Sequence, residues 1–209
     1  MTFPINLQFE ALSGITQMGI YSPIFYSFLF LHVVSFIIAF GSVIFIDTCG
    51  LLWILKKVKM SFVNSVADIG TKLIWTGLSG LVISGTVLIL FKGYIDQLTA
   101  IKLFFVALVA LNGINLHFIK KSSAHITDTD EMPALIRFRI TVASTISQIS
   151  WWGAVTIGFV HRHIQHNIPY PTNPWLWMVG ILITISTIAI LGEVILRKSP
   201  APNASYTKI

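Results

Sequence analysis

The sequence predicts an all-α integral membrane protein, a bundle of about five transmembrane helices with its N-terminus outside and its C-terminus in the cytoplasm. Hydrophobic residues make up 55% of the chain and charged residues only 11%, whereas a soluble domain carries about 25% charged residues. The mean hydropathy of +0.80 indicates a surface that is solvated largely by hydrocarbon. Long apolar stretches and an uneven distribution of Lys and Arg give the number of spans and the orientation.

Length, net charge and cysteine content limit the domain organisation, the partners and the kinds of metal site that the chain can have. A chain of 209 residues is filled by one helical domain, which leaves no room for a separate soluble module. The net charge of +6 is explained by Lys and Arg gathering on cytoplasmic loops, so we expect no nucleic-acid partner. Cys49 is the only cysteine, which excludes an intrachain disulfide and a cysteine-rich metal site.

The first span is predicted at residues 22–46. No Asp, Glu, Lys or Arg occurs between Glu10 and Asp47, and about 20 apolar residues suffice to cross the hydrocarbon of a bilayer. Ser22-Pro23 is typical of an N-cap followed by a first-turn proline. An apolar extension continues beyond this span toward the first cluster of lysines.

The two ends of the chain lie outside the predicted bundle of residues 22–198. Residues 1–21 mix apolar and small polar groups, and we expect an interfacial segment there. A re-entrant helix within residues 3–20 is the alternative. Residues 199–209 form a short polar tail.

Four further apolar stretches predict the remaining spans, at residues 69–91, 98–119, 134–160 and 175–196. Each has cations near an end, namely Lys92, Lys120 and Lys121, Arg137 and Arg139, and Arg197 and Lys198. Five spans place most cations on one side of the membrane. The predicted cytoplasmic cations are Lys56, Lys57, Lys59, Lys72, Lys120, Lys121, Arg137, Arg139, Arg197, Lys198 and Lys208. Only Lys92, Lys102 and Arg162 remain outside, and this bias sets the orientation in the inner cell membrane.

Small residues at helical spacing predict the faces that point into the bundle, because close approach drives helix association in lipid. The second span carries Thr76, Gly80 and Ser84, with Gly77 and Gly85 beside them; the fourth carries Ser150, Ala154 and Gly158; the first carries His32, Ser35, Ala39 and Ser42. Helix packing alone accounts for most of these residues.

No acidic or basic residue falls near the middle of a predicted span. We expect Asp47, Asp68 and Glu193 at the cytoplasmic ends, where Asp68 precedes Lys72 and Glu193 precedes Arg197 by four residues. Intramembrane ionisable groups usually mark ion and proton pathways. The sequence therefore disfavours an ion-coupled carrier.

The polar residues left in the apolar zone are His32, Asn112, Asn115 and Gln148. His32 lies about 15 Å below the outer surface at a rise of 1.5 Å per residue. A histidine at this depth needs a partner, because an unsatisfied polar ring costs several kcal/mol. The alternatives are a hydrogen bond across the bundle and ligation of a metal or haem.

The first span resembles the opening helix of two groups of bacterial membrane families. The matching residues are Leu31 to Phe36 running on to Gly41, Leu81 to Gly85, and Ile101-Lys102-Leu103. They resemble the membrane protoporphyrinogen oxidases and the copper-resistance-D-like proteins over residues 25–120. For the oxidases the resemblance implies bound haem b, with histidines in the first and third spans.

The third-span histidine is where this chain departs from that pattern. The family position falls near Leu111 or Asn112, whereas His117 comes a turn and a half later. His32 and His117 would then differ by about 13 Å in height. The pair is a candidate haem site, and a snorkelling His117 beside the lysines is the alternative.

A second cluster, His161, His163 and His166, follows the fourth span. A loop could bring these three side chains to one ion, so they are a candidate copper or metal site. A loop that dips toward His32 could also pair one of them with it. Solvated histidines are the alternative.

Two functions of different class follow. The specific hypothesis is a redox or cofactor-binding membrane protein, with haem b or copper held by His32 and a second histidine. The alternative is a non-catalytic component: an assembly factor, a partner subunit or a small-solute channel. The expected partners are the lipid bilayer and a second membrane chain, either a copy of this one or another subunit. No nucleophile elbow or phosphate-binding loop is present, so the sequence assigns no reaction.

Overall fold

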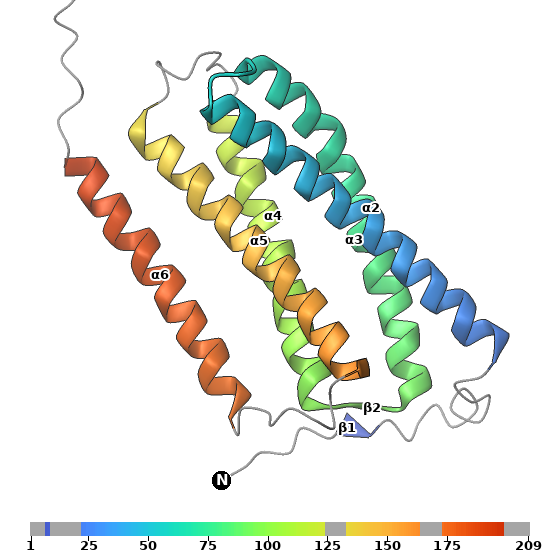
Figure 1. The fold of residues 1–209 in the computed structure, drawn as a ribbon. Helices are drawn as coiled ribbons and strands as arrows, with labels where there is room; N and C mark the ends of the chain where they lie inside the picture. The colour runs from blue at the N-terminus through green and yellow to red at the C-terminus, as the bar shows by residue number, and fades with distance from the viewer. Residues whose placement is uncertain (1–6, 9–21, 124–132, 164–172, 199–209) are drawn as a thin grey trace, which may run out of the picture.

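The computed structural model describes residues 7–8, 22–123, 133–163 and 173–198, and within them the chain is all-α apart from one short strand pair. Five long helices lie side by side and alternate in direction (Figure 1). The elements are β1 (Leu7–Gln8), α2 (Pro23–Ile54), α3 (Met60–Lys92), β2 (Tyr94–Ile95), α4 (Gln97–Ser123), α5 (Ala134–His163) and α6 (Pro174–Lys198). The predicted all-α fold is confirmed.

The two ends of the bundle differ in character. At one end, the strand end, β1 pairs antiparallel with β2, and α2 and α6 begin there (Figure 1). At the other end, the arginine end, Arg139 of α5 and Arg197 of α6 meet at one carboxylate. The helices run between the strand end and the arginine end.

Four of the helices are long and apolar enough to cross a membrane: Pro23–Ile54, Met60–Lys92, Gln97–Lys121 and Trp175–Arg197. The helix α5 is also long, with 30 residues, but it is less apolar. Polar residues on both faces account for the difference, among them the buried Ser147 and Ser150 and the exposed Thr141, Thr145 and Thr156. A helical membrane bundle is the architecture that these features indicate.

The first two helices extend beyond the predicted spans. The helix α2 begins after Ser22, whose hydroxyl caps it by accepting from the Phe25 amide (3.2 Å). The helix α3 begins at Met60, nine residues before the predicted span, because Met60 and Val63 bury their side chains. They pack with Cys49 and the other members of a cluster beyond the apolar stretch. The interfacial segment predicted for residues 1–21 lies outside the described residues apart from β1, and the tail 199–209 lies outside them entirely.

The closest helix approach joins α2 to α3. A Cβ added at Gly77 would lie 2.6 Å from the Ser35 carbonyl oxygen and 2.8 Å from Ala39, so only glycine fits. Ser35 and Ala39 are buried. The predicted inward faces are thus confirmed here, whereas Thr76 is exposed and its hydroxyl bonds to its own helix.

A second pair is formed by α4 and α5. The ring of Phe105 on α4 lies against Gly153 of α5, and the buried Asn112 donates a hydrogen bond to the Ala143 carbonyl (2.7 Å). Large aromatic side chains join this pair to the first one, with Phe40 of α2 stacked on Trp151 of α5. The bundle is therefore two close helix pairs joined through side chains.

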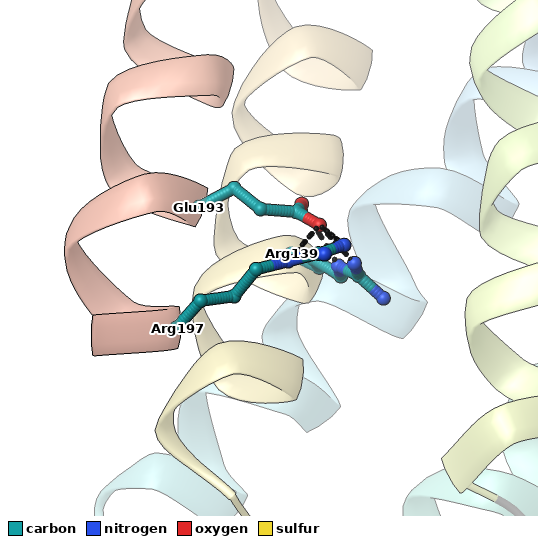
Figure 2. Close-up of polar contacts among 3 residues, drawn as sticks. All are labelled: Arg139, Glu193 and Arg197. Atoms are coloured by element: carbon teal, nitrogen blue, oxygen red, sulfur yellow. Dashed lines mark hydrogen bonds and ion pairs between the residues drawn. The ribbon is translucent and has the colours of Figure 1, made fainter. Parts of the chain in front are cut away.

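The helix α6 is the most peripheral element and lies beside α5 (Figure 1). Among its described side chains only Met178 is buried. Near the arginine end its Gly192 accommodates the ring of Phe138. Glu193 accepts hydrogen bonds from Arg139 of α5 and from Arg197 of its own helix, as Figure 2 shows.

Candidate functional site

His32 is held in the bundle by a hydrogen bond to the next helix. Its Nδ1 atom lies 3.0 Å from the hydroxyl oxygen of Ser84, which is fully buried. The Ser84 hydroxyl donates its own proton to the Gly80 carbonyl (2.5 Å). The tautomer that satisfies both contacts carries the proton on Nδ1 and keeps a lone pair on Nε2.

The His32 ring, which extends from α2, packs against residues of α3. A Cβ at Gly85 would lie 3.3 Å from the His32 Cε1 atom, so the absence of a side chain there makes room for the imidazole. This arrangement holds the tautomer and orientation that a ligating histidine needs.

A lysine of α4 has an electrostatic influence on this histidine. Lys102 of α4 is half-buried, and its charge acts on His32. Its Nζ atom is 3.8 Å from the position of a Cβ at Gly158, which brings α5 to the same level. Among the described residues no carboxylate forms an ion pair with Lys102. The described part of the strand end therefore holds an oriented imidazole and a lysine with no ion pair to a described carboxylate, a combination suited to an anionic group with a histidine ligand.

The structure places the other predicted site histidines at different levels. His117 is exposed on α4, with its ring 6.1 Å from that of Phe118. It comes 15 residues after Lys102 on one helix, about 22 Å nearer the arginine end. His32 and His117 are therefore not brought together.

The histidines that follow the fourth predicted span fall partly within α5. The backbone of α5 continues to His163, so His161 lies one turn beyond Gly158. The side chains of His161 and His163, and all of His166, are outside the described part of the chain. Within that part, no group of three His, Cys, Asp or Glu side chains is arranged to hold a metal ion.

Asp47 lies deeper in the bundle than predicted. We expected it at a helix end, but α2 continues for seven residues beyond it, to Ile54. Both carboxylate oxygens accept hydrogen bonds from α5: Oδ1 from the Ser144 hydroxyl (2.9 Å) and Oδ2 from the Gln148 amide (2.5 Å). The apolar residues after Asp47 continue the helix and carry the carboxylate away from its end.

The other two predicted carboxylates do lie near the arginine end. Glu193 pairs with Arg197, as the four-residue spacing predicts, and also with Arg139 of α5 (Figure 2). Asp68 forms its ion pair with Lys120 of α4. These two inter-helix ion pairs join α5 to α6 and α3 to α4.

The connection between α3 and α4 at the strand end is built on Asp96. Gly93 ends α3 with φ 75°, a conformation that favours glycine. Asp96 Oδ1 accepts from the Thr99 amide (2.8 Å), and Oδ2 pairs with Lys92 (2.8 Å). Burial opposes ionisation of Asp96, but the hydrogen bonds from Lys92 and Thr99 outweigh it and hold the pKa of this carboxyl below its ordinary value.

Sequence reasoning identified His32 but neither of its neighbours as site residues. Ser84 belonged to a stripe of small residues attributed to packing, and Lys102 was counted as an outer cation and as part of the family resemblance, not as a site residue. The signal for Ser84 was its place on a face shared with Gly80 and Gly85. Comparisons of the chain with protein-family models, with curated proteins and with solved structures gave no match.

Proposed function

We propose that this chain is a five-span membrane protein that binds a redox cofactor at its strand end through His32. Haem b is the first candidate and copper the second. The observation that carries the proposal is the hydrogen bond from His32 to Ser84, because it leaves the Nε2 lone pair free for a metal. The resemblance of the first three spans to haem-binding oxidases points in the same direction.

The residues near His32 fit haem better than a bare ion. Copper usually needs several histidine or sulfur ligands together, whereas haem iron is held by one or two axial ligands. Lys102 supplies a cation that can pair with a haem propionate. Haem would add electron-transfer chemistry, while His32 and Lys102 bind and orient it.

In this proposal a second histidine that holds the haem would come from α5 rather than from α4. His161 follows Gly158 by one turn, and Gly158 lies at Lys102. His117 is on the far part of α4, about 22 Å away along the helix. Two histidines that hold one haem would need to lie at a similar height, so His161 would suit the role better than His117.

The absorption spectrum of the purified protein tests this function. We expect a Soret band and near-stoichiometric haem, lost in His32→Ala and retained in the matched variant His117→Ala. Copper in place of haem, bound by wild type and lost in His32→Ala, would support the second candidate. A colourless, metal-free protein with the stability of a folded bundle would overturn both.

The orientation is part of the proposal and has its own test. The arginine end carries the clustered cations and faces the cytoplasm, and the strand end faces outward. Cys49 is buried, so Cys49→Ser gives a cysteine-free background. In that background Asn173→Cys should react with an impermeant maleimide from outside, and Lys59→Cys only after the membrane is opened. Protection of Asn173→Cys would contradict this orientation, and protection of both positions would mean that an odd number of helices between them does not cross.

A non-catalytic subunit is the second candidate, and α6 is the observation that favours it. This helix exposes large apolar side chains on most of its length, including Leu176, Ile183 and Ile190. A helix of a partner subunit could cover these side chains in place of lipid. A stoichiometric partner that is lost when these three residues are replaced by Ala, from a protein without pigment, would favour this candidate.

A further inference from the structure

The turn between α2 and α3 concentrates positive charge at the arginine end (Figure 1). Residues 55–59, the lysine turn, hold Lys56, Lys57 and Lys59, and all three side chains are exposed. No Asp or Glu occurs among residues 48–67. The turn therefore carries three cations without a carboxylate nearby in the sequence.

Several other cations at the arginine end are neutralised by carboxylates. Glu193 binds two arginines, and Asp68 binds Lys120. By contrast, no carboxylate in the described part of the chain forms an ion pair with Lys57 or Lys59. The lysine turn is thus available to an anion from outside the chain.

The backbone around the lysine turn does not offset its charge. Lys59 is the N-cap of α3, but its side chain caps no amide, and the first turn of α3 contains no acid. The amides of a helix N-terminus carry a partial positive charge that an acidic group normally offsets. Lys56 has φ 58° just after α2, at a position where glycine is usual. Lysine therefore occupies two positions at which other residue types would be more stable.

Exposed apolar side chains flank the lysines. Leu51, Ile54 and Leu55 at the end of α2 are between 55% and 58% exposed, and Phe62 near the start of α3 is 49% exposed. Such side chains are unfavourable in water and favourable among acyl chains. Basic and large apolar side chains together are typical of surfaces that bind at the boundary between lipid headgroups and acyl chains.

The length of α2 places the lysine turn at this boundary. With 32 residues, α2 is about 48 Å long at a rise of 1.5 Å per residue. A bilayer is about 30 Å thick in its hydrocarbon and about 40–45 Å with its headgroups. A helix of this length that crosses the membrane ends among the headgroups, and this holds for either orientation of the bundle.

We propose that the lysine turn binds anionic phospholipids of the adjoining leaflet. Lys57 and Lys59 pair with the phosphate of the headgroup, while Ile54 and Leu55 contact the acyl chains. A soluble anion would engage the lysines but leave these apolar side chains in water. Leu55 is 23 residues from His32 along α2, about 34 Å away, so this surface is independent of the proposed cofactor site.

Native mass spectrometry of the full-length protein in mixed micelles tests this surface. Phosphatidylglycerol and phosphatidylcholine with identical acyl chains, offered in equal amounts, differ in headgroup charge. Wild type should retain phosphatidylglycerol in preference. This preference should fall by about fivefold for each lysine removed in the double variant Lys57→Gln, Lys59→Gln. The matched control Lys72→Gln, Lys121→Gln removes the same charge from exposed positions outside the turn and should keep the preference.

Two further variants separate charge from apolar contact. Lys57→Arg with Lys59→Arg keeps the charge and should keep the preference, whereas Ile54→Asn with Leu55→Asn should weaken retention of the lipid. Equal retention of both lipids by wild type, or an equal loss of preference in the matched control, would overturn the proposal. Displacement of the lipid by an equal concentration of glycerol phosphate would assign the lysines to a soluble anion instead. Unchanged circular dichroism of each variant establishes that the bundle is intact.

Discussion

The Nδ1 atom of His32 lies 3.0 Å from the Ser84 hydroxyl oxygen, although 52 residues separate the two in the chain. The Ser84 hydroxyl donates a hydrogen bond to the Gly80 carbonyl of its own helix, so His32 Nδ1 is the donor in the tautomer that satisfies both contacts. This buried hydroxyl therefore orients His32 and adds a hydrogen bond to the contact between α2 and α3. The function proposed for the strand end depends on this contact.

Replacing Ser84 by Ala should weaken the bundle and loosen the cofactor. The loss of one buried hydrogen bond lowers the free energy of unfolding by about 1 kcal/mol. Without its acceptor the imidazole can rotate, so haem content should fall relative to wild type. Thr86→Ala is the control, because the Thr86 hydroxyl is exposed and bonds only to its own helix. Equal haem loss in both variants would contradict the role of Ser84.

Gly77→Ala should destabilise the contact between α2 and α3. The added Cβ would meet backbone atoms of Ser35 and Ala39, which cannot move aside as a flexible side chain does. We expect a loss of about 1–3 kcal/mol in the free energy of unfolding. Gly41→Ala, with nothing within 4 Å of the added Cβ, should be neutral or slightly stabilising. Thermal unfolding in one detergent compares the two, and similar midpoints would refute the packing described.

Arg139→Ala should release α6 from the rest of the bundle. Arg139 is the side chain that joins Glu193 to α5, whereas Arg197 pairs with Glu193 within α6 (Figure 2). Amide hydrogen exchange in the last turns of α6 should therefore be faster in Arg139→Ala than in Arg197→Ala. The same exchange rates in both variants would mean that the inter-helix ion pair does not hold α6.

The connection between α3 and α4 should be sensitive to acid. Because the pKa of Asp96 is lowered on folding, its ionised form stabilises the folded state at pH values above the ordinary 3.8. This contribution is lost as the pH falls below 3.8 through the lower folded value. Asp96→Asn lacks it at every pH, so the stability difference between wild type and variant should shrink on acidification. A difference that is independent of pH would contradict the hydrogen bonds assigned to Asp96.

Most of the fold could be predicted because apolar length is a local property. Ser22-Pro23 marks the start of α2, and the cations near each stretch mark the turns. The start of α3 could not be predicted in the same way. Its first turns are mixed in polarity, and they are helical because Met60 and Val63 pack on Cys49, a contact between separate helices.

Of the candidate site, only His32 could be predicted, because a histidine is unusual in an apolar helix. A histidine in an apolar helix is visible in the sequence, but its bond to Ser84 depends on how two helices are rotated against each other. Asp47 was placed at an interface because charges usually end a span. The hydrogen bonds from Ser144 and Gln148, about 100 residues later, are what hold it inside.

The ratio of haem to protein in purified wild type, compared with His32→Ala, tests the central claim most directly. The proposed function predicts about one haem per chain, with a Soret band that disappears in His32→Ala while His117→Ala keeps it. Wild type that folds as a stable bundle without haem or copper would contradict the claim. Full haem content in a folded His32→Ala variant would contradict it as well.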